Sequence, residues 1–536
     1  MNKEDFLEIG YNKVTSLTYA GTFTQQKSSV FATDQIANRD SASWKKSQVI
    51  EITDELSQDE QNRIIAKWKN LSWFDQQLLL CGDDGDYLLV DGYGEIISNG
   101  DEKQILSTLR RIKGEYIYSK KVPETEGIDN ESLRKIFRPD YLAAIRTKPF
   151  LLLAGISGTG KSRIVKEMAY ASCPDEGDLR KDKTSPGNYC LVEVKPNWND
   201  STELLGYETV LDGGNYHLTK FVKFLIKAMQ HENVPFFVCL DEMNLAPVEQ
   251  YFAEFLSILE SRKDVDGTIK SEPLIPAAIF EKYKQKLHEE LFPTKDSSNT
   301  SRGAGYYTAD DGTAVYLHST YAKLMDEGLR IPRNLIVVGT VNMDDTTYQF
   351  SRKVIDRAMT IEMNEVNLNY MFDTEKPDAL SYREDVVDKG WFFAPFAQSN
   401  NALQQMNDER ELLAEKIKAT IGQTDADGTT TPDSLEAILG KTPFRIAYRV
   451  VNELILHFYA LRWENKETEF ESLYNKALDN ILMMKVLPRI EGNEDLVKEP
   501  LAQLATWTEV AYPKANAKIV EMRERLERSH FTSFWP

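Results

Sequence analysis

Short apolar runs recur along the middle of the chain, and glycine, acidic or amide residues follow them. Residues 151–154, 235–240 and 334–341 contain such runs, which predict buried β-strands. Residues 163–172 and 248–261 instead place apolar side chains at the spacing of one helix face. Strands that alternate with helices in this way predict an α/β domain with a parallel sheet.

The first part of the chain has a different pattern, which predicts a separate small α+β domain at residues 1–125. A helix is expected at 56–68, and a β-hairpin is expected to join residues 87–90 to residues 95–97 across a glycine-rich turn. A polar connector with proline and glycine follows this domain. The pattern does not indicate what the domain does.

The rest of the chain is predicted to form a core and a helical region. The core occupies residues 131–365, and a long polar insertion at 262–333, helical at 279–291, interrupts it. Residues 366–536 are mostly helical and are expected to form a C-terminal helical lid. Helical spacing is found there at residues 402–417, 444–463, 469–487 and 513–528.

Composition and charge narrow the class of protein. The chain is 41% hydrophobic and 10% aromatic, as expected of a globular protein. Its formal net charge of −20 argues against electrostatic binding of nucleic acid by the molecule as a whole. The N-terminal residues lack a signal-peptide pattern and no apolar run reaches bilayer length, so we expect a soluble, cytoplasmic protein without membrane contact. The four cysteines lack CxxC spacing and are expected to be reduced core residues.

The strand at residues 151–154 is followed by the sequence GISGTGKS at 155–162 and then by a helix. This is the phosphate-loop pattern GxxxxGK[ST] in its required context, between a strand and a helix. Glycines let the backbone curl around a phosphate, the lysine can reach the β- and γ-phosphates, and the final hydroxyl can bind Mg²⁺. The predicted nucleotide-binding residues are Gly155, Ser157, Gly158, Thr159, Gly160, Lys161 and Ser162.

A second motif lies about eighty residues further along, where an apolar strand ends in Asp241 and Glu242. This is the Walker B pattern. Asp241, with Ser162, is predicted to hold Mg²⁺, and Glu242 is predicted to orient or deprotonate the attacking water. Carboxylates belong at the carboxyl end of a parallel strand, where such sheets bind their ligands.

The next strand and the segments after it resemble those of an AAA+ ATPase. Asn342 ends an apolar strand, as the sensor 1 residue does, and is expected to contact the γ-phosphate or the attacking water. Arg357, with Arg352 as second choice, lies where AAA+ proteins carry an arginine finger, whose guanidinium stabilises charge on the transferred phosphoryl group. Arg449 occupies a plausible sensor 2 position.

Several longer motifs resemble the McrB-type branch of AAA+ proteins over residues 131–536. They are Trp198 with LLGY, LDEMNLAPVEQYFAEFLSILES, IPRNLIVVGTVNMDDTTYQFSRKVIDRAMTIEM and MKVLPRIEG, in this order. The resemblance implies a ring of subunits, expected to be a hexamer, with active sites between subunits. It also implies a separately encoded McrC-like nuclease subunit, DNA bound through the complex, and a role in restriction and antiviral defence.

The sequence departs from this family at two places. Residues 341–346 are VNMDDT where the family has MNTADR; Asn342 and Asp345 match, but the arginine is absent, so the nucleotide is ATP or GTP. The N-terminal domain resembles nothing in the family. Two other functions therefore stay open: a MoxR-like ATPase that remodels a protein partner, and a nucleotide-switched scaffold that hydrolyses slowly.

Overall fold

The computed structural model divides the chain into two compact units, Met1–Pro123 and Glu124–Pro536. In the first unit it describes the backbone of three strands only. In the second it describes residues 139–535 apart from seven gaps, at 212–213, 266–267, 294–305, 309–313, 344–349, 365–379 and 407–408.

The described part of the N-terminal unit is an antiparallel sheet of β1 (Leu78–Cys81), β2 (Tyr87–Val90) and β3 (Ile96–Gly100), in that order. The predicted hairpin is confirmed, because β2 and β3 pair, with Tyr87 opposite Gly100. The helix predicted at residues 56–68 lies outside the described residues.

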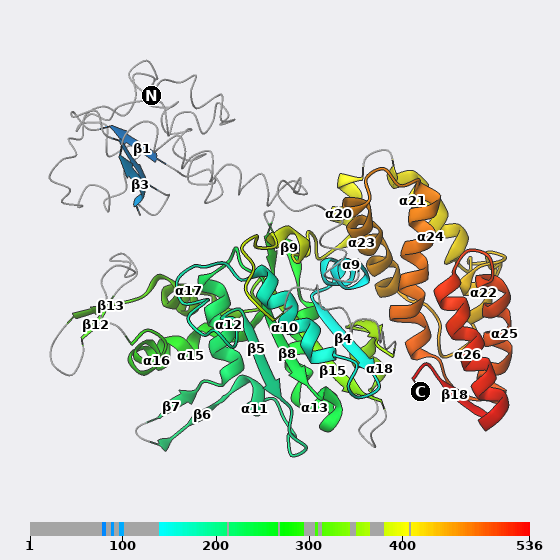
Figure 1. Ribbon diagram of the computed structural model, residues 1–536, viewed down its shortest axis with the longest axis horizontal. Helices are drawn as coiled ribbons and strands as arrows, with labels where there is room; N and C mark the ends of the chain where they lie inside the picture. Colours follow the sequence, from blue (N-terminus) through cyan, green and yellow to red (C-terminus); the bar gives the residue numbers. More distant parts are fainter. Residues whose placement is uncertain are drawn as a thin grey trace. The chain divides into compact units, whose positions relative to one another are not determined.

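A five-stranded parallel sheet forms the centre of the second unit (Figure 1), in the order β16-β4-β15-β8-β5. The phosphate-loop strand β4 therefore has β15 and the edge strand β16 as neighbours, and β15 separates it from the acidic strand β8. The strands are β4 (Phe150–Gly155), β5 (Tyr189–Glu193), β8 (Phe236–Asp241), β15 (Leu335–Asn342) and β16 (Met359–Glu362).

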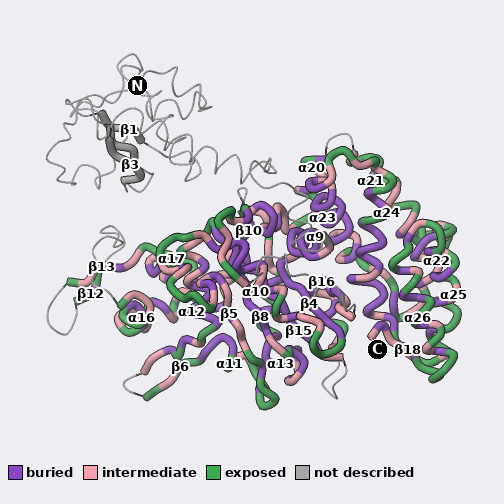
Figure 2. Tube along the Cα trace, viewed as in Figure 1, coloured by how far each residue is buried: buried purple, intermediate pink, exposed green. Residues whose placement is uncertain are grey.

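The central strands are apolar throughout because both faces of the sheet are covered. All six residues of β4 are buried, and so are the first seven of β15 (Figure 2). Since neighbouring side chains of a strand point to opposite faces, continuous burial means that helices cover both sides. The helix that follows the phosphate loop is α10 (Lys161–Ser172). A second helix, α12 (Lys220–Gln230), packs beside β5, the edge strand on the side away from β16.

The predicted helices of the core exist, and the one at 163–172 is continuous as α10, but two others are each broken once. The segment at 248–261 forms α13 (Val248–Tyr251) and α14 (Ala253–Glu260), and the segment at 279–291 forms α15 (Ala277–Lys282) and α16 (Lys284–Leu291). At the first break Phe252, with φ −108° and ψ 3°, leaves the helical conformation and stacks on Phe255 at 4.7 Å between ring centroids. Tertiary packing therefore decides these boundaries.

The sequence pattern missed several short hairpins. One is β6 (Tyr207–Thr209) with β7 (Asn215–His217), which precedes α12. The others lie in the insertion, which also contains α17 (Ser319–Glu327). They pair β9 (Lys263–Val265) with β10 (Thr268–Lys270) and β12 (Tyr306–Thr308) with β13 (Ala314–Tyr316). A further antiparallel pair, β11 (Pro273–Ile275) with β14 (Leu329–Arg330), is not a hairpin, because most of the insertion lies between its two strands.

The C-terminal region is a bundle of helices, as predicted. The segment predicted at 402–417 is two helices, and the one at 469–487 ends in a π-helical turn, η7 (Leu482–Val486), and a 3₁₀ turn, η8 (Leu487–Arg489). Helix α25 was not predicted. The α-helices are α20 (Ser399–Gln405), α21 (Glu409–Thr420), α22 (Leu435–Leu439), α23 (Tyr448–Glu464), α24 (Phe470–Ile481), α25 (Glu494–Thr508) and α26 (Pro513–Ser529).

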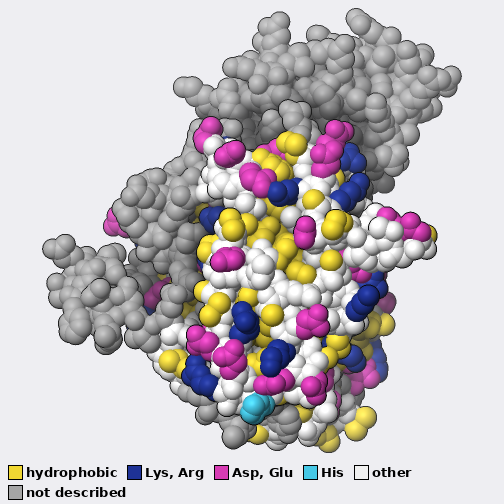
Figure 3. Space-filling view, turned by 90° about the vertical axis from the view of Figure 1, so that its right-hand side faces the viewer, with side chains coloured by type: hydrophobic (Ala, Val, Ile, Leu, Met, Phe, Trp, Pro, Cys, Tyr) yellow, Lys and Arg dark blue, Asp and Glu magenta, His cyan; other side chains and the backbone are white. Residues whose placement is uncertain are grey.

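Acidic and basic side chains are interspersed around a central area of hydrophobic ones on the side of the molecule that includes this bundle (Figure 3). Val510, two residues after the end of α25, is among the exposed hydrophobic residues, with 95% of its surface accessible. This face therefore offers no extended surface of one charge. Within the described residues, no helix combines the length and the apolar character needed to cross a membrane.

Candidate functional site

The phosphate-loop residues form a tight turn between β4 and α10. Gly158 and Gly160 both have a φ of 82°, in the left-handed region that favours glycine. Lys161 is only 6% exposed, and its Nζ donates hydrogen bonds to the carbonyl oxygens of Gly155 at 3.0 Å and Ile156 at 2.7 Å. The ammonium group thus lies within the curve of the loop, beside the N-terminus of α10, where a phosphate would be bound.

The remaining loop residues complete this turn. Thr159 Oγ1 donates a hydrogen bond to the Ile156 carbonyl oxygen at 3.0 Å, and Ser157 is exposed. Gly155 is required for a different reason, since a Cβ there would approach the Met363 carbonyl oxygen to 2.3 Å. The chain leaving β16 therefore passes directly against the start of the loop.

Ser162 and Asp241 meet at the carboxyl ends of β4 and β8. Ser162 Oγ donates to Asp241 Oδ1 at 2.5 Å, and Thr340 Oγ1 donates to the same oxygen at 2.7 Å. The described residues contain no group of three or more His, Cys, Asp or Glu side chains that could hold a metal. The Mg²⁺ of a nucleotide complex takes one or two protein oxygens and completes its shell with phosphates and water. Ser162 and Asp241 fit that role.

Glu242 and Asn342 lie together at the same edge of the sheet. Asn342 Nδ2 donates a hydrogen bond to Glu242 Oε1 at 3.2 Å, and the Glu242 backbone N–H donates to Thr340 Oγ1 at 3.0 Å. Glu242 has a φ of 51°, a left-handed conformation that is uncommon for a residue with a side chain. Its carboxylate is exposed to solvent, beside the sites of phosphate and metal, where a carboxylate can orient a water molecule.

The three predicted arginines lie elsewhere, and Arg357 is found near the amino ends of the strands. Arg357 precedes β16, and Met359 at the start of that strand pairs with Leu151 near the start of β4. The phosphate loop begins four residues further along β4, which is about 13 Å at ~3.3 Å per residue. Neither Arg357 nor a residue beside it therefore approaches the phosphate loop of its own chain.

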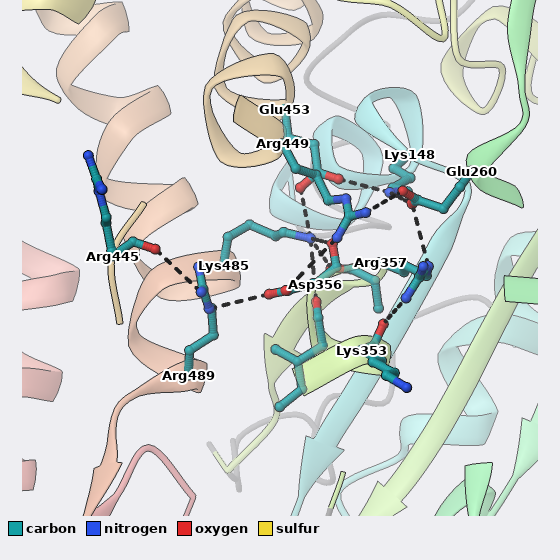
Figure 4. A network of polar contacts seen from close by, with 12 residues as sticks. Lys148, Glu260, Lys353, Asp356, Arg357, Arg445, Arg449, Glu453, Lys485 and Arg489 are labelled. Atoms are coloured by element: carbon teal, nitrogen blue, oxygen red, sulfur yellow. Dashed lines mark hydrogen bonds and ion pairs between the residues drawn. The ribbon is translucent and has the colours of Figure 1, made fainter. Parts of the chain in front are cut away.

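Arg357 and Arg449 meet at Glu260, together with Lys148 (Figure 4). Arg449 Nη2 lies 2.5 Å from Glu260 Oε2, Lys148 Nζ lies 3.2 Å from Glu260 Oε1, and Arg357 Nε lies 3.9 Å from the same oxygen. We call these four residues the Glu260 cluster. Burial alone would raise the pKa of the Glu260 carboxyl, but Lys148 and Arg449 hold that pKa below its usual value. One carboxylate thus orients two arginines.

Arg352 lies apart from the Glu260 cluster. Its Nη1 donates to the Pro443 carbonyl oxygen at 3.2 Å, and its guanidinium lies 5.4 Å from the centre of the Phe444 ring. The structure thus brings the phosphate loop, Asp241, Glu242 and Asn342 together, and it places Arg357 and Arg449 side by side at a second location. The catalytic roles assigned to these side chains stay predictions.

Sequence reasoning missed three residues of these sites. Thr340 holds Asp241 from two positions before Asn342, and its polar side chain in an apolar strand is the signal that could have revealed it. Asn364 accepts a hydrogen bond from the Ile156 backbone N–H at 3.0 Å, and Glu260 organises the arginines. Nothing in the sequence distinguishes these two from surface residues.

Comparisons with known proteins identify relatives of parts of the chain only. A family model described as a domain of unknown function (DUF8727) matches residues 414–531, less than a quarter of the chain. The UvrABC system protein A of Staphylococcus epidermidis is 24% identical over 160 residues, and that of Bacillus subtilis is 24% identical over 213. These matches cover 25% and 34% of this chain but only 16% and 21% of the relatives' own length.

Among solved structures, the chain is similar to a Cytophaga hutchinsonii protein provisionally assigned as an ATPase. The match covers 77% of this chain and 98% of the other, at 12% identity and a TM-score of 0.37. A TM-score this low is no evidence of a shared fold, so the fold assignment rests on strand order and site geometry. On those grounds the predicted α/β class, a parallel-sheet core with a phosphate loop followed by a helical region, is confirmed.

Proposed function

We propose that this protein is an AAA+ nucleoside triphosphatase. The observation that carries the proposal is the meeting of three side-chain oxygens and one amide at one sheet edge: Ser162 with Asp241 at 2.5 Å, and Glu242 with Asn342 at 3.2 Å. These contacts join the first turn of α10, directly after the phosphate loop, to the carboxyl ends of β8 and β15. A structural role for one such residue would not require the others to converge.

Each residue then has a distinct part in hydrolysis. The loop N–H groups and Lys161 would bind the phosphates of ATP or GTP, and Ser162 and Asp241 would hold Mg²⁺, whose charge would offset that of the phosphates. Glu242 orients the attacking water and accepts its proton, and Asn342 positions the Glu242 carboxylate through their hydrogen bond.

A Glu242→Gln variant tests this directly. It should bind nucleotide as the wild type does and lose about 10²–10⁴-fold in turnover, because the amide cannot accept the proton. Lys161→Ala should lose binding instead. Phosphate release and the binding of a fluorescent ATP or GTP analogue separate the two effects; wild-type turnover by Glu242→Gln would overturn the assignment.

The position of the arginines supports a ring of subunits, expected to be a hexamer. The Glu260 cluster lies near the amino ends of the strands, whereas the phosphate loop lies at their carboxyl ends. Arg357 and Arg449 are therefore too far away to act on the nucleotide of their own chain. A second copy of this chain, packed with its phosphate loop against that cluster, would bring a nucleotide to them. Both arginines then act in trans, with Arg352 as the alternative finger.

Within this class we propose that the protein is the motor of a McrBC-like restriction system and works with a McrC-like nuclease subunit. The support is the sequence resemblance; the domain-level and curated comparisons do not extend to this assignment. Turnover should rise when the product of a neighbouring nuclease gene and modified DNA are added together. Stimulation by a protein partner without DNA would instead favour a MoxR-like remodeller.

A further inference from the structure

The edge strand β16 is held at both ends by lysines of the C-terminal bundle. At its start, Lys485 of the π-helical turn η7 donates hydrogen bonds to the carbonyl oxygens of Asp356 and Ala358, both at 2.8 Å. At its end, Lys518 of α26 forms an ion pair with Glu362 at 2.7 Å. The bundle is therefore fixed to the strand that lies beside the phosphate-loop strand.

The second contact continues into the phosphate loop itself. Glu362 Oε1 also accepts a hydrogen bond from Asn364 Nδ2 at 2.7 Å, and Asn364 Oδ1 accepts one from the backbone N–H of Ile156 at 3.0 Å. Ile156 is the second residue of the phosphate-loop motif. Lys518, Glu362, Asn364 and Ile156, which we call the Lys518 relay, thus connect α26 to the nucleotide site in three polar contacts.

The relay allows little alternative geometry. Asn364 is bound on both sides of its amide, so its orientation is fixed: the nitrogen can only face the Glu362 carboxylate, and the oxygen the Ile156 N–H. Lys518 is 4% exposed and its ammonium lies 4.9 Å from the centre of the Phe534 ring. Lys518 also pairs with Glu521 on its own helix at 3.0 Å, but Glu362 is its carboxylate partner in the core, so a movement of α26 must move Glu362 or break that second, buried pair.

We propose that Lys518 and Glu362 are positioning residues that set the conformation of the phosphate loop from the C-terminal bundle. This inference rests on the proposed nucleotide binding. When the relay is intact, Asn364 holds Ile156 and keeps the loop open to phosphate. When α26 shifts, Glu362 releases Asn364, the entrance of the loop is freed, and nucleotide binds more weakly. The bundle thereby regulates the affinity of the site.

Thermodynamic linkage makes this coupling reciprocal. If the position of α26 changes nucleotide affinity, bound nucleotide must stabilise α26 against local opening by the same free energy. Backbone amides of Pro513–Ser529 should therefore exchange hydrogen more slowly in the presence of nucleotide, although none of them belongs to the phosphate loop.

The test measures the dissociation constant of N-methylanthraniloyl-ATP, and of the GTP analogue, with Mg²⁺ and full-length protein. Lys518→Met and Glu362→Gln should each raise it about five- to thirtyfold. Arg528→Met is the matched control, because Arg528 lies on the same helix but pairs with Glu524 at the exposed surface. Its dissociation constant should equal that of the wild type.

A double variant shows whether Lys518 and Asn364 act through one connected pathway or affect nucleotide binding independently. Asn364→Ala alone disconnects Ile156, so adding Lys518→Met should weaken binding no further, and nucleotide should no longer slow exchange in α26. Additive losses would overturn the relay, as would wild-type affinity in both Lys518→Met and Glu362→Gln. If Lys518→Met does not fold, Glu362→Gln decides alone. Failure of the wild type to bind either analogue would instead refute the proposed function.

Discussion

Thr340 shows how one residue can support several others in the site. Its buried hydroxyl donates to Asp241 and accepts from the Glu242 backbone N–H, so it links β15 to the metal-binding and water-orienting carboxylates. The same hydroxyl therefore fixes the position of both acidic residues relative to Asn342, two residues further along the strand.

Thr340→Val keeps the side-chain volume and removes this hydroxyl. A hydrogen bond to a charged group contributes about 1.5–3 kcal/mol, so turnover should fall roughly 10- to 100-fold. Thr340→Ser keeps the hydroxyl and should retain most activity. Steady-state phosphate release measures both variants, and equal rates for Val and Ser would show that Thr340 has only a packing role.

His457 is a buried histidine whose surroundings favour its neutral form. Thr147 Oγ1 donates to the Ala143 carbonyl oxygen and so accepts from His457 Nδ1 at 2.8 Å, while Asn480 Nδ2 lies 3.1 Å from Nε2 as a donor. A proton on Nε2 would point at the Asn480 N–H group and remove this hydrogen bond, so the contact favours the neutral ring. Burial, with smaller contributions from Lys476 and Lys514, lowers the pKa of His457 to about 4.

This pKa predicts a loss of stability in mild acid. The unfolded state gains a proton near the usual pKa of 6.5, whereas the folded state does not until about pH 4, so stability is lost as the pH falls between these values. The contribution is at most about 1.4 kcal/mol per pH unit. Urea unfolding at pH 7 and pH 5 should show a smaller difference in stability for His457→Gln than for the wild type, and an equal difference would contradict this role of His457.

Among the elements, the π-helical turn η7 joins the bundle to the core. Its Lys485 is 1% exposed and pairs with Glu453, itself 2% exposed, at 2.7 Å; Glu453 also pairs with Lys148 of the Glu260 cluster at 2.9 Å. Burial lowers the pKa of Lys485, and the attraction of Glu453 opposes this. In the π-helical turn, which has about one more residue per turn than an α-helix, the Lys485 side chain points toward the carbonyl groups that precede β16.

Lys485→Met should destabilise the protein by about 3–5 kcal/mol, because Glu453 and the carbonyl groups before β16 lose a buried cation. Lys498→Met removes an exposed pair with Glu494 and should cost less than about 1 kcal/mol. Chemical unfolding compares them. Replacing Glu453 by Met as well should recover part of the loss, and a double variant less stable than Lys485→Met would contradict a charge-based explanation.

At the scale of the whole molecule, the Glu260 cluster lies near the amino ends of the strands and the phosphate loop at their carboxyl ends, so the proposed arginine finger is expected to act on nucleotide bound by a second chain. Arginine fingers contribute on the order of 10³-fold or more to turnover, so Arg357→Ala should abolish hydrolysis while isolated subunits bind nucleotide normally. Mg²⁺ and a slowly hydrolysed nucleotide should also convert small species into a ring in mass photometry.

Mixed rings test the action of Arg357 in trans. Lys161→Ala subunits keep their arginine, and Arg357→Ala subunits keep their phosphate loop, so some mixed interfaces combine two intact halves and activity should partly return. Rings that demonstrably contain both variants but remain inactive would assign Arg357 a structural role and leave Arg352 as the next candidate.

The sequence by itself determined the features that depend on residues close together in the chain, namely the motifs and the strands that carry them. The GISGTGKS motif, the apolar strand that ends in Asp241 and Glu242, and the strand that ends in Asn342 each combine a periodic pattern with a local turn, and the structure contains all three strands. The carboxyl ends of parallel strands lie along the same side of a sheet, so even the contact between Ser162 and Asp241 could be expected.

Only the tertiary structure decided which distant residues meet. Glu260 contacts Arg449, and Lys518 contacts Glu362 from 156 positions away. These contacts depend on where the C-terminal bundle packs against β16. Helical periodicity predicts that a helix has a buried face, but not which partner covers it or which lysine on that face meets a carboxylate. The meeting of Arg449 with Arg357 at Glu260 follows from that packing.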